Sequence, residues 1–196
     1  MINYLRLFID LCLFRRPVSL LPKSDGLLLA TALSYVLIVA ISMTTSGALT
    51  AFFPTLIGAI GWILVVGASL YLVLRIKGFS ERWNQAISAI FGALSITNII
   101  VWPFLADGIE TVQAIQAIMN DNSDLRTFTE TEVTEIYFFP MLVIASINFW
   151  QIAIQTSILR QALELHSQVR IKVTLFVFLF FFNLMIASIL NSFFAY

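Results

Sequence analysis

Long apolar segments, separated by short charged ones, dominate the chain. The segment from Gly26 to Leu74 has no charged residue, and its length is about twice the roughly 20 residues that one membrane-spanning helix needs. We therefore expect a helical hairpin that breaks at residues 44–47, where Thr-Thr-Ser-Gly interrupts the apolar pattern, with Pro54 starting its second helix. Three further apolar segments follow. The pattern predicts an all-α polytopic membrane protein, a bundle of five transmembrane helices at about 27–46, 52–74, 83–106, 136–159 and 173–196.

The first residues predict a short amphipathic helix in an N-terminal unit, residues 1–25, ahead of the transmembrane domain, residues 26–196. Asn3, Arg6 and Asp10 fall on one helical face. The opposite face is apolar and carries Ile2, Leu5, Phe8, Ile9 and Cys12. Two interpretations are open. The helix lies in the membrane interface with Arg15 and Arg16 near the lipid headgroups, or it packs against the protein's own spans.

Residues 107–135 form the one long polar segment between predicted spans. Apolar residues recur in it at near-helical spacing, at Ile109, Val112, Ile115 and either Ile118 or Met119. This spacing predicts an amphipathic helix on the membrane surface in the loop between the third and fourth spans. A turn is expected at 120–124, and Thr129 with Glu132 fits a capping box for the next helix.

The distribution of basic residues predicts the orientation of the chain. With five spans, the N-terminal segment and the second-to-third and fourth-to-fifth loops fall on one side and hold ten of the eleven Lys and Arg residues, with only Arg126 opposite. The positive-inside rule puts that side in the cytoplasm. We therefore expect a cytoplasmic N-terminus and an external C-terminus. The loop at 107–135 holds acidic residues instead, and could engage a basic partner.

Composition narrows the class of protein. The chain is 60% hydrophobic and 11% charged, against roughly 25% charge in soluble domains. The lipid bilayer is therefore its expected environment. Nucleic acid is not an expected partner, because no basic cluster interleaves with aromatic residues. Cys12 is the only cysteine, so an internal disulfide is excluded.

Little in the sequence points to catalysis. The predicted spans contain no Asp, Glu, His, Lys or Arg, which are the usual markers of proton relays and coupled transport. His166 is the only histidine and lies in a loop without a nearby acid set. Residues 121–124 lack the turn glycine and terminal Glu of a calcium loop. We predict no catalytic residue, no cofactor and no metal site.

Uncharged polar and small residues on the spans are the candidate functional positions. Amides in hydrocarbon need hydrogen-bond partners, and small residues let helices approach closely. These faces are therefore expected to point into the bundle or toward another subunit; the alternative is that they line a polar permeation path. The candidates are Asn84, Ser88, Gly92, Ser95 and Asn98 on the third span, Asn148, Gln151 and Gln155 on the fourth, and Asn183 and Asn191 on the fifth.

Three stretches resemble the bacterial branch of the Yip family of Ypt/Rab-interacting membrane proteins. The first is Arg16-Pro17-x-x-Leu20-Leu21-Pro22-x-Ser24, the second runs from Gly78-Phe79-x-x-Arg82-x-x-Gln85-Ala86 to Gly92-Ala93-Leu94, and the third is Ile158-Leu159-Arg160-Gln161-Ala162-Leu163. The resemblance implies five spans and a non-enzymatic protein that organises partners or shapes membranes. The long acidic N-terminal region of the eukaryotic relatives is missing, which puts Rab-type binding in doubt.

Together these observations and the resemblance predict a non-enzymatic protein of a bacterial inner membrane that binds or organises other integral membrane proteins, or copies of itself, in an accessory, scaffold or membrane-shaping role. The alternative is a component of a transporter or channel whose path is lined by amides.

Overall fold

The computed structural model describes residues 4–45, 52–120, 130–165 and 168–194. Every regular element in these ranges is helical. The helices are α1 (Tyr4–Cys12), α2 (Asp25–Thr45), α3 (Phe52–Ile76), α4 (Trp83–Asn120), α5 (Glu130–Ala162) and α6 (Val169–Phe194), with short 3-10 turns at Val18–Leu20 and Ser80–Arg82.

Among the residues whose side chains the structure describes, four helices are long and apolar enough to cross a membrane. Their apolar stretches are Asp25–Ser42, Phe52–Ile76, Ser80–Leu105 and Leu142–Ala162. These match the first four predicted spans. The described residues are therefore all helical, and four of their helices have the length and composition of membrane spans, as in an integral membrane protein.

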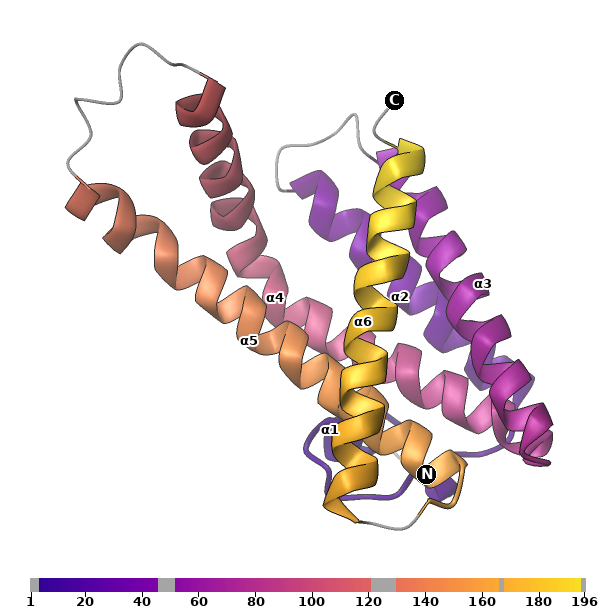
Figure 1. Cartoon of the computed structure of the whole chain (residues 1–196). Helices are drawn as coiled ribbons and strands as arrows, with labels where there is room; N and C mark the ends of the chain where they lie inside the picture. Colours follow the sequence, from indigo (N-terminus) through magenta and orange to yellow (C-terminus); the bar gives the residue numbers. More distant parts are fainter. Residues whose placement is uncertain (1–3, 46–51, 121–129, 166–167, 195–196) are drawn as a thin grey trace.

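Helix α4 is longer than the sequence suggested. The expected surface helix around 109–119 is not separate, because α4 continues past Pro103 to Asn120. Its 38 residues measure roughly 57 Å at 1.5 Å per residue, whereas the hydrocarbon core is about 30 Å thick. Helix α5 also starts early, at Glu130 rather than near Ile136, and Figure 1 shows the two helices extending together away from the others. The expected turn at 120–124 and the cap at Thr129 fall largely outside the described residues.

Helix α4 is the centre of the bundle. Of its apolar stretch, 61% is buried, against 17–28% for the other three. Helices α2 and α5 make the most extensive contacts with it, and α3 and α6 lie further out. The buried residues of α4 are mostly small or aliphatic, which allows several helices to approach it: Ala86, Ile87, Ala89, Ile90, Phe91, Ala93 and Leu94.

Helix α1 packs against the protein's own spans. Leu7, Phe8, Leu11 and Cys12 are buried in the same core as the α4 residues. This is the second of the two interpretations left open by the sequence. The helix also keeps an exposed apolar stripe at Leu5, Ile9 and Leu13, which suits contact with lipid at the membrane interface. One apolar face of α1 therefore packs against the bundle, and the other is available for contact with lipid.

One end of the bundle is called the N-terminal pole (Figure 1). It carries α1 and the loops at residues 13–24, 77–82 and 163–165. Helices α1, α3 and α5 all end here with a left-handed residue, namely Phe14 at φ 58°, Gly78 at φ 79° and Glu164 at φ 52°. After α3, for example, Phe79 N–H donates to Leu74 O at 2.8 Å and Gly78 N–H to Arg75 O at 3.1 Å. This is the Schellman pattern, which satisfies the last carbonyls and turns the chain sharply. The three loops are thereby brought close together.

Candidate functional site

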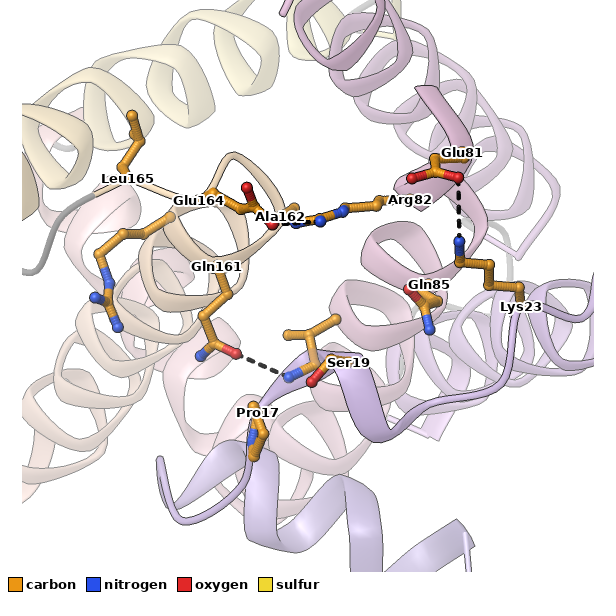
Figure 2. A pocket seen from close by; sticks show the side chains of 12 residues that line it. Pro17, Ser19, Lys23, Glu81, Arg82, Gln85, Gln161, Ala162, Glu164 and Leu165 are labelled. Carbon is orange, nitrogen blue, oxygen red and sulfur yellow. Dashed lines mark hydrogen bonds and ion pairs between the residues drawn. The ribbon is translucent and has the colours of Figure 1, made fainter. Parts of the chain in front are cut away.

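A cleft with a volume of about 570 Å³ lies at the N-terminal pole. Its walls come from the loop after α1, the start of α4 and the end of α5. Figure 2 shows Glu81 and Lys23 on one side of this cleft, with Gln161 and Glu164 on the other. We call it the polar cleft. It is lined by Pro17, Val18, Ser19, Lys23, Glu81, Arg82, Gln85, Arg160, Gln161, Ala162, Glu164 and Leu165.

Two glutamines fix the first wall of the polar cleft. The side-chain oxygen Oε1 of Gln161 accepts the backbone N–H of Val18 at 2.8 Å (Figure 2). From α4, Gln85 Nε2 donates to the carbonyl oxygen of Leu21. Val18 and Leu21 themselves are buried in the core. Because the loop has both apolar anchors and backbone hydrogen bonds to two helices, the cleft is held open in a defined shape.

Ion pairs connect the walls of the polar cleft at its rim. Arg82 pairs with Glu164 across the cleft, and Lys23 Nζ lies 3.5 Å from Glu81 Oε2. Beside them, Asn84 Nδ2 donates to Asp25 Oδ1 at 2.5 Å. Exposed pairs of this kind add little to stability, typically below about 1 kcal/mol. Their main effect is on the charge of the surface, because side chains of both charge signs surround the opening of the polar cleft.

The docking of α1 supports the loop that forms the first wall. Trp150 Nε1 on α5 donates to the carbonyl oxygen of Cys12 at 3.1 Å, and Cys12 Sγ lies 3.8 Å from Ala93 O. Phe8 packs directly on Gly92, where an added Cβ would lie 2.3 Å from the ring. This close contact means that Gly92 makes room for α1, rather than for a second span. Burial in the same region raises the pKa of the Cys12 thiol to about 11.

The predicted amides on α5 have three different environments. Gln151 Nε2 donates to Thr97 Oγ1 at 2.9 Å and to Asn98 Oδ1 at 3.3 Å, so it connects α5 to α4. Gln155 is buried and faces α6, where Asn183 Nδ2 lies 3.5 Å from Gln155 Oε1. Asn148 is exposed on the outer surface of α5. The three amides thus do not share a single surface.

The remaining candidates are dispersed. Ser95 is buried and donates to the carbonyl of Phe91 in its own helix at 2.8 Å. Ser88 is fully buried, and its hydroxyl has no hydrogen-bond partner among the described residues. Asn84 lies at the rim of the N-terminal pole, away from the amides of the spans. Asn191 belongs to the part of α6 whose side chains are not described.

Four residues with structural roles at these contacts, Gln85, Gln161, Thr97 and Trp150, are not among the predicted site residues. Gln85 and Gln161 belong to the stretches that resemble the Yip family, but each is an isolated polar residue near a helix end. Thr97 and Trp150 read as ordinary span residues, because a hydroxyl or an indole at one position gives no periodic signal. Their roles depend on partners 54 to 143 residues away in the chain.

Comparison of the chain with known protein families, curated proteins and solved structures finds no match.

Proposed function

We propose that this chain is a non-enzymatic accessory protein of the membrane that binds a segment of another membrane protein in the polar cleft. The observation that carries the proposal is the construction of that cleft. Three distant segments form it, and hydrogen bonds from Gln85 and Gln161 hold its loop wall in place. A surface that is ordered in advance loses less conformational entropy on binding.

The lining of the polar cleft suits a polar peptide segment. Lys23 and Arg82 supply positive charge and Glu81 and Glu164 supply negative charge around one opening. A partner with charges of both signs can exchange these exposed pairs for pairs of its own at little cost, because exposed pairs are weak. Such complementarity contributes mainly to specificity and the rate of association.

The proposed topology has five spans, with α6 as the fifth. Helix α6 has 26 residues, enough to cross a core of about 30 Å. Ten of the eleven basic residues then lie at the N-terminal pole. The positive-inside rule supports a cytoplasmic position for this pole and an external C-terminus. The resemblance to the bacterial branch of the Yip family supports a bacterial inner membrane. The polar cleft would open toward the cytoplasm.

The Yip resemblance supports a partner-binding role. Its three stretches are separated by dozens of residues in the sequence, yet each contributes to the polar cleft. Pro17 comes from the first, Arg82 and Gln85 from the second, and Arg160 and Gln161 from the third. Residues that resemble the Yip family therefore gather at the polar cleft. This favours a binding surface in common with that family over a common pattern of spans alone.

The competing function, a transporter or channel component, has weaker support. Gln151 and Gln155 bond to polar groups of neighbouring helices, as contacts between helices require. The cavity beside Gln155 and Asn183 is small, about 80 Å³, and is lined mostly by apolar residues of α3 and α6. A transport role predicts solute flux in reconstituted vesicles that Gln151→Leu and Gln155→Leu alter.

The test is photo-crosslinking in native membranes. A benzophenone amino acid at position 19, on the wall of the polar cleft, should capture one defined membrane protein. The same group at position 76 is the matched control, because Ile76 lies at the N-terminal pole outside the cleft and is 81% exposed. Identical adducts at both positions, or no protein adduct at position 19, would contradict the proposal.

A blocking variant gives a second readout. Ser19→Trp fills the polar cleft with a bulky side chain, and Ile76→Trp places the same side chain outside it. We expect the partner to be lost from affinity-purified Ser19→Trp protein and retained by Ile76→Trp protein. Retention of the partner by both variants would show that the partner binds outside the polar cleft.

A further inference from the structure

A second cleft, of about 510 Å³, lies between the end of α5 and the beginning of α6. Arg160 and Lys172 line it toward the N-terminal pole, and Val173 and Phe176 line it on α6. Ala153, within the apolar stretch of α5, is part of the opposite wall. The cleft therefore passes from a charged end at the N-terminal pole to an apolar end beside the apolar stretch of α5.

The two cations of this cleft are not neutralised by the protein. Neither Arg160 nor Lys172 forms an ion pair with a carboxylate of the described residues. The nearest acid in sequence, Glu164, is paired with Arg82. Across the whole N-terminal pole, ten basic residues face four acidic ones. An anion is thus the expected occupant of the charged end.

The shape of the apolar end selects among anions. Phe176 is stacked against Phe149, with ring centroids 6.4 Å apart, and Phe149 stacks in turn on Phe180 at 5.7 Å. These rings continue the apolar wall away from Arg160 along α5 and α6. A free phosphate would leave this part of the cleft unused, whereas a phospholipid presents an anionic headgroup and an acyl chain in the same order. Basic side chains near the interface can also extend toward headgroups.

We propose that this cleft binds an anionic phospholipid from the leaflet at the N-terminal pole. Arg160 and Lys172 contact the headgroup phosphate, and the hydroxyl of Ser157, which also lines the cleft, supplies a further donor. One acyl chain lies along Val173 and Phe176. Arg160 also lines the polar cleft, so a bound lipid would neutralise a charge close to the partner-binding surface.

The test is native mass spectrometry of the full-length protein released from vesicles that contain zwitterionic and anionic phospholipid. A basic side chain near an anionic surface contributes roughly fivefold in affinity, so we expect Arg160→Gln with Lys172→Gln to lower retention of the anionic lipid roughly thirtyfold. Lys172→Gln alone, outside the polar cleft, should lower it roughly fivefold, and Lys172→Arg should restore it.

The matched control is Arg75→Gln with Lys77→Gln. It removes the same charge from exposed positions at the same pole, outside this cleft. We expect it to change lipid retention less than twofold.

An equal loss in the control and the cleft variants would mean general attraction to the surface and would overturn the proposal. Retained lipid in both variants would do the same. Displacement of the lipid by inorganic phosphate at equal concentration would refute the assignment to a lipid. Because Lys172 does not line the polar cleft, failure here leaves the partner-binding proposal standing.

Discussion

The contact between Phe8 and Gly92 holds α1 against α4, and a single methyl group at position 92 can test it. A Cβ added at Gly92 would lie 2.3 Å, 2.5 Å and 2.8 Å from three carbon atoms of the Phe8 ring. Carbon atoms in contact normally lie about 3.5–4.0 Å apart, so the ring has to move by more than about 1 Å. Phe8 is buried among the residues of α4 and α1 and has little free space. In Gly92→Ala, we therefore expect α1 to undock more often.

The size of the effect follows from the packing. Overpacking of a well-filled core typically costs about 1–3 kcal/mol, which corresponds to an increase of about 5-fold to 150-fold in the undocked population. Cys12 reports on this population, because it is the only cysteine in the chain and is buried when α1 is docked. The rate of maleimide labelling of the purified protein should rise by that factor. Phe8→Leu in the Gly92→Ala background should bring the rate back down.

The pH dependence of labelling gives an independent signature. Burial raises the pKa of the Cys12 thiol from the ordinary value of 9.0 to about 11. The raised pKa means that docking favours the neutral thiol. The contribution of the neutral thiol to the stability of the docked state is complete below pH 9 and is lost as the pH rises toward 11. The wild-type labelling rate should therefore rise about tenfold per pH unit up to about pH 11, whereas protein with α1 undocked should level off near pH 9.

Gly67→Ala is the matched control for this experiment. It adds the same methyl group to a helix at a buried glycine, but its Cβ would lie 3.8 Å from Ile87 and Trp83, an ordinary contact distance. Labelling of Cys12 should stay near the wild-type rate. The reasoning would be refuted if Gly92→Ala left the labelling rate unchanged, or if Gly67→Ala raised it equally.

Two further predictions concern the spans. Gln151→Leu should lower the free energy of unfolding in detergent by about 0.6–1.7 kcal/mol, because its bonds to Thr97 and Asn98 are lost. Asn148→Leu, one helical turn away and exposed, should leave that free energy unchanged and weaken assembly on native gels; equal loss of stability in both variants would contradict the structure's placement of the two amides. For the topology, alkaline phosphatase fused after Tyr196 should be active and green fluorescent protein dark, because five spans put the C-terminus outside. The reverse pattern would remove α6 from the list of spans.

The apolar segments and the charges between them determined the class of the protein and the positions of four spans. This information is local, because burial in lipid depends on the composition of each segment rather than on its neighbours. The surface helix expected at 109–119 is part of α4 instead of a separate element. Near-helical spacing cannot distinguish a new helix from the continuation of an old one, since both have the same period.

The tertiary structure alone decided which polar residues meet. Asn148, Gln151 and Gln155 were expected on one face, but the crossing of α5 with α4 and α6 gives each a different environment. The polar cleft depends on Gln161 reaching Val18 across 143 positions and Gln85 reaching Leu21 across 64. No local pattern encodes such pairs. They exist because left-handed residues at the ends of α1, α3 and α5 turn three loops toward one pole, where the packing of the helices on α4 sets the distances between them.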